Sequence, residues 1–466
     1  MAKPVGYVSL GCPKALVDSE HIVTELDALG YELTADLDHA STVVINTCGF
    51  IDAAKDESFE AIESALDLGK RVVVTGCLGA EAQGLQAKYP ALEFVSGPQD
   101  VASVVKGVQS YEPLMEHVKE PASPLTNAQA GGSVPPTGAV DVGDFARTRL
   151  TPPHYAYLKV SEGCNHSCAF CIIPSMRGKL RSRPIADVLQ EAQTAVEQGA
   201  KELLVIAQDL SAYGVDMKYA ESSWQGKPLA TRLFDLCQAL GELGVWVRLH
   251  YVYPYPHVDQ IIPLMRDGLI LPYLDIPLQH AAPEILSLMK RPAAAERTLE
   301  RIHRWREICP ELTIRSTFVV GFPGETDAHV GQLLDFLEAA ELDRVGCFTY
   351  SAVEGASANL LPDHVDETDK MDRQEAVYDV QSSISARRLA GKVGTTLRVL
   401  VDDHAENGFI ARSSADAPEI DGQVFVTMAG ATSSRPNVGE FAWVEITDSD
   451  EHDLYGVSAG SGVELK

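Results

Sequence analysis

The sequence lacks three features that would place it in familiar classes of protein. It has no apolar run long enough for a membrane helix, so we do not expect it to span a bilayer. It has no excess of positive charge, because 66 aspartates and glutamates outnumber 38 lysines and arginines, a net charge of −28. Nucleic-acid-binding proteins usually carry a basic surface, so this balance favours a basic partner or serves solubility alone. Nine cysteines in 466 residues do not make a disulfide scaffold.

The amino-terminal segment also lacks the features of a secretory signal. Val8–Cys12 looks like a lipoprotein cleavage box, but the apolar run before it is too short, and only Lys3 is positive. We therefore expect a cytoplasmic protein in which a first strand ends near a functional Cys12. The reducing environment of the cytoplasm favours metal binding by cysteines.

Three cysteines do stand close together in the sequence. Cys164, Cys168 and Cys171 have the spacing Cys-x-x-x-Cys-x-x-Cys. Zinc sites and electron-transfer iron–sulfur clusters usually take four ligands, and no fourth cysteine lies nearby. Three thiolates on a four-iron cube leave one iron open to bind a substrate, which indicates catalysis. The alternative is a zinc site in which His166 supplies the fourth ligand.

Three further cysteines each follow a predicted strand. Cys12, Cys48 and Cys77 come after the strands predicted over residues 7–10, 42–46 and 71–75. The carboxyl ends of parallel strands share one edge of a sheet, so we expect these thiols to converge on a second iron–sulfur cluster with an open iron. The alternative is three ordinary buried cysteines. We interpret the remaining three as packing residues: Cys237, Cys309 and Cys347.

The pattern of the chain predicts an α/β protein with four segments. Residues 1–111 form a Rossmann-like α/β domain, in which Asp18 or Ser19 caps a helix that ends near Leu29, and a second helix covers residues 53–68. Residues 112–150 are a Pro- and Gly-rich linker. Residues 151–390 alternate strand and helix, and residues 391–466 form a small antiparallel β-barrel of OB type.

The central segment predicts a partial (β/α)6 barrel of TIM type. Its strands are expected at residues 156–161, 203–207, 246–249, 273–276, 313–320 and 345–350, with helices at residues 185–198, 229–243, 295–308 and 328–340. The active site of such a barrel lies at the carboxyl ends of its strands. The three-cysteine loop follows the first strand and therefore belongs there.

Other polar residues follow the later strands of this barrel. They are Gln208-Asp209, Arg248 to His250, Gln279-His280 and the segment Gly321 to Thr326. The glycines of that segment, Gly321 and Gly324, allow backbone N–H groups to approach a ligand. Each strand-end residue has the alternative role of capping a helix. His250, His280 and Arg291 are candidates to line the site without an assigned role.

The last segment predicts short strands at residues 396–401, 408–411, 424–428 and 441–447, with a hairpin turn at Asn407-Gly408. Residues 392–466 contain five Lys or Arg and 13 Asp or Glu, a net charge of −8. Single-stranded nucleic-acid sites on such barrels are basic. This barrel is acidic, which favours a basic partner, with solubility as the alternative.

Long stretches of the chain resemble the methylthiotransferases of the radical S-adenosylmethionine (SAM) superfamily. They are residues 161–166, 172–178, 208–216, 249–254, 275–280 and 417–422. The resemblance implies a TRAM domain for the last barrel, and it implies two 4Fe–4S clusters, one on Cys12, Cys48 and Cys77 that delivers sulfur. The other, on Cys164, Cys168 and Cys171, binds SAM and generates a 5′-deoxyadenosyl radical. It also implies a set of SAM contacts: Phe170, Gln208, Gln279, Gly321 and Gly324.

Within that family the chain is most similar to the members that modify an aspartate of small-subunit ribosomal protein twelve. The resemblance implies insertion of a methylthio group at the β-carbon of that aspartate, on the protein or within the ribosomal subunit, and an electron donor. A departure is the linker, which is longer and richer in Gly and Ala than the family pattern. One alternative is a methylthiotransferase acting on tRNA adenosine, and another is a non-enzymatic iron–sulfur or zinc scaffold protein.

Overall fold

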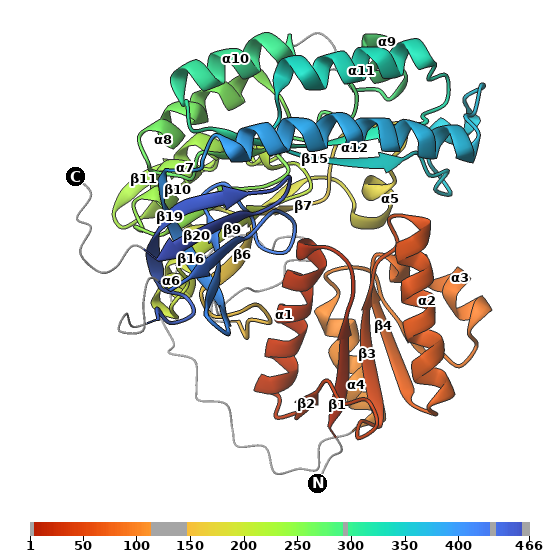
Figure 1. Cartoon of the computed structure of the whole chain (residues 1–466). Helices are drawn as coiled ribbons and strands as arrows, with labels where there is room; N and C mark the ends of the chain where they lie inside the picture. Colours follow the sequence, from red (N-terminus) through yellow and green to blue (C-terminus); the bar gives the residue numbers. More distant parts are fainter. Residues whose placement is uncertain (1–3, 113–146, 292–296, 429–434, 459–466) are drawn as a thin grey trace. The chain divides into compact units, whose positions relative to one another are not determined.

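The computed structural model describes residues 4–112, 147–291, 297–428 and 435–458 of the chain. The chain separates into two compact units, Met1–Leu150 and Thr151–Lys466, and each is described by itself (Figure 1). Most of the linker predicted over residues 112–150 lies outside the described residues. No helix in the described ranges combines the length and apolar character needed to cross a membrane.

The first unit is a parallel sheet with helices on both faces. Its strand order is β2-β1-β3-β4-β5, with β1 (Val5–Ser9), β2 (Leu33–Thr34), β3 (Thr42–Thr47), β4 (Arg71–Gly76) and β5 (Phe94–Val95). The helices are α1 (Pro13–Ala28), α2 (Asp52–Asp67), α3 (Ala82–Lys88) and α4 (Val101–Tyr111). Successive residues of β3 face opposite sides, since Val44 packs with α1 and α4 whereas Val43 packs with α2 and α3. The predicted Rossmann-like domain is confirmed.

The start of α1 differs from the prediction. We expected Asp18 or Ser19 to cap this helix, but α1 begins at Pro13, with Cys12 as its N-cap residue. Proline suits the first helical turn because its φ is already helical and an N–H there has no intrahelical partner. Asp18 and Ser19 are buried within the helix, and the Ser19 hydroxyl lies 2.8 Å from the hydroxyl of Ser9.

The second unit contains a sheet of six parallel strands in sequence order, with β6 and β15 at its edges. The strands are β6 (Tyr155–Lys159), β9 (Glu202–Ile206), β12 (Trp246–Leu249), β13 (Tyr273–Asp275), β14 (Thr313–Val320) and β15 (Arg344–Thr349). The helices are α6 (Ile185–Glu197), α7 (Leu233–Gly241), α8 (Ile262–Arg266), α9 (Pro283–Leu288), α10 (Thr298–Ile308), α11 (Asp327–Ala340) and α12 (Glu367–Ala390). Strand residues such as Leu203, Val247 and Leu274 share one apolar core with these helices. The predicted partial barrel is confirmed.

Two helices begin later than predicted. The helix expected over residues 229–243 begins at Leu233, because Lys227–Ala230 forms strand β11 of a hairpin with β10 (Glu221–Trp224). The helix expected over residues 295–308 begins at Thr298, and its first predicted residues fall partly outside the described residues.

The carboxyl-terminal segment is a closed five-stranded barrel in the order β16-β17-β18-β20-β19. Its strands are β16 (Thr396–Ala405), β17 (Gly408–Ser413), β18 (Val424–Thr427), β19 (Phe441–Ser449) and β20 (Leu454–Ser458). The expectation of a wholly antiparallel barrel is wrong in one place, because β18 and β20 pair in parallel. The predicted hairpin is present, but its two-residue loop is Glu406-Asn407, since Gly408 already pairs with Ala405.

The segment between β17 and β18 attaches this small barrel to the six-stranded sheet. The Tyr273 hydroxyl donates a hydrogen bond to Asp421 at 2.6 Å, and Arg344 lies 2.7 Å from Asp416. Arg412, at the end of β17, lies 2.6 Å from Glu202 of β9, and both side chains are buried. Charged side chains therefore line the inner face of the sheet where the small barrel contacts it.

Candidate active site

The three-cysteine loop lies between two short strands that hold its ends together. β7 (Ser161–Glu162) pairs antiparallel with β8 (Arg181–Ser182), and the helix α5 (Ile173–Arg177) lies between them in the chain. Gly163 has φ +75°, and a Cβ there would lie 2.3 Å from the carbonyl oxygen of Lys179, so only glycine fits this turn. The Cys164 N–H donates to the carbonyl of Gly178 at 3.1 Å. These contacts fix the loop at the carboxyl end of β6.

The three thiols of this loop are half-buried and lie among hydrogen-bond donors. Burial raises the pKa of Cys164 to about 11 and that of Cys171 to about 12, although backbone N–H groups act in the opposite direction. The donors are the N–H of His166, 3.4 Å from the Cys164 sulfur, and the N–H of Ile173, 3.5 Å from the Cys171 sulfur. Metal ligation requires the thiolate, and such donors stabilise its negative charge.

A cation stands beside the third thiol. Arg291 Nη1 lies 3.7 Å from the sulfur of Cys168, and Nη2 donates to the carbonyl of Pro277 at 2.7 Å. The guanidinium carbon lies 4.0 Å from the ring centre of Tyr253, which fixes the plane of the arginine. The donor set of three thiols with a neighbouring cation fits an anionic iron–sulfur cluster.

His166 is not placed as a fourth metal ligand of this loop. Its Nε2 lies 2.8 Å from a carboxylate oxygen of Asp209, and its ring stacks on Tyr253 at 4.3 Å. Among the described residues, no group of three or more His, Cys, Asp or Glu side chains is arranged to hold a single metal ion. Three thiolates that hold a four-iron cube each bind a different iron, so the three sulfurs need not converge on one point. The zinc alternative is not favoured.

Gln208 belongs to a buried polar cluster just before the cysteine loop. Its Nε2 lies 2.5 Å from Glu162, which also binds Lys159 at 3.1 Å and Arg177 at 3.0 Å. Burial alone would raise the pKa of Glu162, but Lys159 and Arg177 lower it to about 2. The side-chain oxygen of Gln208 is buried without a hydrogen-bond partner among the described residues, which leaves an acceptor without a donor.

The other predicted SAM contacts lie on neighbouring strand ends. Phe170 packs against a small apolar cluster that includes Ala282 and Phe322. Gln279 has φ +73°, and its backbone pairs with β14 through Thr317 and Val319. Its assignment to SAM binding stays a prediction.

Two glycines of that set serve the fold in this structure. A Cβ at Gly321 would lie 2.2 Å from the side chain of Lys370, so this glycine makes room for Lys370. The Gly324 N–H donates to the carbonyl of Asp363, and the N–H of Phe322 donates to Glu325. These N–H groups are satisfied within the protein, and the contribution of the segment to SAM binding stays a prediction.

Two histidines without an assigned role each have a carboxylate partner. His250 Nδ1 lies 3.3 Å from Asp275, and His280 Nε2 lies 3.5 Å from Glu325. Both histidines are buried. Sequence reasoning missed the Glu162 cluster and the stack of His166 on Tyr253, although the alternation Tyr251-Val-Tyr253-Pro-Tyr255 after a strand is a signal for such a stack.

The other three cysteines lie at the carboxyl ends of adjacent strands of the first unit. Cys48 directly follows β3, Cys77 directly follows β4, and Cys12 lies three residues after β1. The loops touch, because a Cβ at Gly11 would lie 3.0 Å from Cβ of Cys48 and one at Gly49 would lie 3.2 Å from the carbonyl carbon of Cys77. This shared edge fits a second cluster on three thiolates. The three cysteines expected to pack are buried, as predicted: Cys237, Cys309 and Cys347.

Family models match three parts of the chain. The radical SAM superfamily matches residues 158–337, the TRAM domain matches residues 393–458, and the uncharacterized protein family UPF0004 matches residues 5–97. These matches agree with the partial barrel, the small β-barrel and the α/β domain.

Curated relatives are similar over nearly the whole chain. A protein named ribosomal protein uS12 methylthiotransferase RimO from Azoarcus sp. (strain BH72) is 56% identical over 451 residues, which are 97% of this chain and 96% of the relative. A relative of the same name from Legionella pneumophila (strain Corby) is 55% identical over 457 residues, 98% of each chain. Another, from Hahella chejuensis, is 55% identical and covers 97% of this chain and 98% of the relative.

A solved structure has a similar fold. It is the radical S-adenosylmethionine methyltransferase TsrM from Kitasatospora setae, with cobalamin and a 4Fe–4S cluster bound. The TM-score is 0.50 at 15% sequence identity, over 75% of this chain and 72% of that one. At this identity the likeness concerns the fold alone.

Proposed function

The chain belongs to the RimO family of ribosomal protein uS12 methylthiotransferases, and from that membership we propose how its own residues carry the activity. The protein is a radical SAM transferase that works with SAM and two 4Fe–4S clusters. Cys164, Cys168 and Cys171 hold the cluster that binds SAM. The second cluster is held by the cysteines of the first unit, Cys12, Cys48 and Cys77.

The observation that carries this proposal is the position of the two cysteine sets. Each set of three stands at the carboxyl ends of parallel strands, in one unit on a single loop and in the other on three adjacent loops. When bound, SAM and the clusters supply radical hydrogen abstraction and the transfer of sulfur and a methyl group. That chemistry suits the β-carbon of an aspartate, because a C–H bond of such low acidity is beyond a tuned side-chain base.

The chain's own residues position and shield these groups. Arg291 places a positive charge next to Cys168, and the Glu162 cluster holds the base of the loop rigid. Gln208 offers a buried oxygen that accepts a hydrogen bond from a bound ligand. Asp209 holds the imidazole of His166, whose ring stacks on Tyr253, so the Nε2 of His166 is engaged within the protein.

The partners are part of the proposal. The substrate is an aspartate of uS12, as the free protein or within the small ribosomal subunit, and an external donor supplies electrons. The acidic composition of residues 392–466 suits a basic protein and disfavours direct binding of tRNA.

Single cysteine variants test the division of labour between the sites. Cys168→Ala is expected to abolish formation of 5′-deoxyadenosine from SAM, measured by chromatography after anaerobic reconstitution. Cys48→Ala is expected to retain that cleavage and to form no methylthio product. Cys309→Ala, a buried cysteine outside both sets, is the matched control and should retain both. Methylthio product from Cys48→Ala would show that the sulfur site is assigned wrongly.

A further inference from the structure

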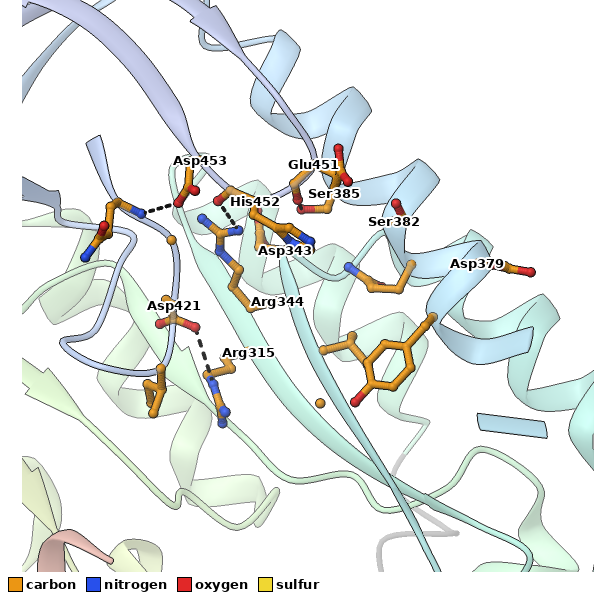
Figure 2. A pocket seen from close by; sticks show the side chains of 17 residues that line it. Arg315, Asp343, Arg344, Asp379, Ser382, Ser385, Asp421, Glu451, His452 and Asp453 are labelled. Atoms are coloured by element: carbon orange, nitrogen blue, oxygen red, sulfur yellow. Dashed lines mark hydrogen bonds and ion pairs between the residues drawn. The ribbon is translucent and has the colours of Figure 1, made fainter. Parts of the chain in front are cut away.

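A polar pocket of about 720 Å³ lies in the second unit, away from the cysteine loop (Figure 2). It is bounded by the first residues of β14 and β15, by α12, and by two loops of the small barrel around residues 420–423 and 451–453. Arg315 is the third residue of β14 and Arg344 is the first of β15, so the pocket lies at the amino ends of these strands. The predicted SAM contacts lie at the opposite, carboxyl ends. From Arg315 to the end of β14 is about 16 Å, at about 3.3 Å per residue.

The cations that line this pocket are already neutralised. Arg344 lies 2.7 Å from Asp416 and donates to the carbonyl of His452 at 2.9 Å. Arg315 lies 3.2 Å from Asp275 and 3.4 Å from Asp421. An anion entering the pocket would therefore compete with carboxylates that are held in place.

Three carboxylates of the pocket lack such a partner. Among the described residues, Asp379, Glu451 and Asp453 take part in no ion pair, and Figure 2 shows them on α12 and on the loop of the small barrel. Asp343 differs, because Arg306 and Arg388 hold it from outside the pocket, at 3.4 and 2.5 Å. The uncompensated charge of the pocket is therefore negative.

A buried acceptor points to the same class of ligand. Gln381 lines the pocket and is 5% exposed. Its Nε2 donates to the carbonyl of Leu342 at 2.8 Å, whereas its Oε1 is buried without a hydrogen-bond partner in the described part of the chain. A buried oxygen without a donor is costly, so a ligand that supplies an N–H is favoured here. The ring of Tyr378, which is 45% exposed, also lines the pocket and offers a face for a cation.

We propose that this pocket is a docking site for a basic side chain, arginine or lysine, of the protein substrate. The inference rests on the proposed function, and it adds where the substrate is held while its aspartate reacts at the other end of the sheet. A guanidinium or ammonium supplies a donor for Gln381 Oε1 and positive charge for Glu451, while the exposed Asp379 of α12 adds negative charge around the pocket. Because the pocket is remote from the chemistry, it determines binding of the substrate and not the rate of the chemical step.

The test compares two double variants of the reconstituted full-length enzyme. Asp379→Asn with Glu451→Gln removes two charges from the pocket, and both side chains are exposed, so folding is preserved. Asp335→Asn with Glu338→Gln removes two exposed charges from α11, which does not line the pocket. This control therefore has the same net charge as the pocket variant. The substrate is purified uS12, and methylthio product is measured over a range of uS12 concentrations.

The pocket variant is expected to raise KM for uS12 about five- to tenfold, because two exposed charge contacts to the substrate are lost and each contributes modestly to binding. Its kcat and its cleavage of SAM without uS12 should equal those of the wild type, and the α11 variant should change KM less than about twofold. Equal KM in the pocket variant and the wild type, or equal rises in both variants, would overturn the docking site. Absence of product from the wild-type enzyme would instead refute the proposed function, which keeps the two failures distinct.

Discussion

Replacement of Glu202 by alanine is expected to destabilise the second unit strongly. Glu202 is fully buried between two arginines, with Arg248 Nε at 2.7 Å and Arg412 Nη1 at 2.6 Å. Burial alone would raise the pKa of Glu202, but the two arginines lower it below its usual value, so it is ionised at neutral pH. Removing one partner of a buried charge pair leaves the other uncompensated, which costs about 3–5 kcal/mol.

The two arginines do not lose equal shares of their charge compensation when Glu202 is removed. Arg412 keeps Asp402, 2.7 Å away, whereas Arg248 is left with the carbonyl of Ser414 and the face of Tyr273. Most of the cost therefore falls on Arg248, in the middle of the six-stranded sheet. The expected result is a loss of about 3 kcal/mol or more in the free energy of unfolding.

Urea unfolding followed by tryptophan fluorescence measures this loss. Trp246 of β12 lies 4.9 Å from the ring of Phe441 in the small barrel, so its emission reports on the contact between sheet and barrel. Glu300→Ala is the control, because the pair of Glu300 with Arg297 is exposed and is worth less than about 1 kcal/mol. If the free energy of unfolding falls no more in Glu202→Ala than in Glu300→Ala, the buried charges do not hold the small barrel on the sheet.

Three further predictions concern single residues. Gly214→Ala should cost about 2 kcal/mol or more in urea unfolding, because Gly214 has φ +85° and a Cβ would lie 1.6 Å from the carbonyl oxygen of Thr231; a stability equal to that of the wild type would contradict this geometry. Asp402→Asn should make stability depend less on pH in acid. Burial would raise the pKa of Asp402, but His154 and Arg412 lower it below the unfolded value of 3.8. The ionised carboxylate therefore stabilises the fold above pH 3.8, and this stabilisation is lost as pH falls through the folded pKa. Melting curves between neutral pH and pH 3 test this, and parallel curves for the two proteins would refute it. Arg291→Leu should lower the reduction potential of the cluster on the three-cysteine loop, because a positive charge beside Cys168 is lost; a redox titration that gives the wild-type potential would contradict that role.

The sequence predicts the strands and the cysteine positions well because both depend on local pattern. The run Thr42 to Asn46 is β-branched and apolar, as a strand covered on both faces must be, and Cys48 follows directly. The regular alternation of strand and helix over residues 151–390 likewise determines a parallel sheet, and hence the edge at which Cys164 lies. The fold of each unit and the convergence of these loops therefore follow from sequence.

The sequence does not reveal contacts that depend on residues far apart. One example is the charge cluster of Glu202, Arg248 and Arg412. These residues lie on three strands, two in the six-stranded sheet and one in the small barrel, and no local pattern links them. The polar pocket likewise draws on five separate segments. The predicted start of α1 differs from the structure for another reason. Asp18 and Ser19 are residue types that commonly cap helices, but the helix already begins at Pro13.

The most direct test of the account is mass spectrometry after an anaerobic reaction. The reconstituted protein receives SAM, sulfide and a strong reductant, with uS12 in one reaction and bulk tRNA in another. The account predicts the mass gain of one methylthio group, in place of hydrogen, on an aspartate of uS12 and none on tRNA. The same gain on tRNA adenosine, with none on uS12, would contradict the assigned substrate.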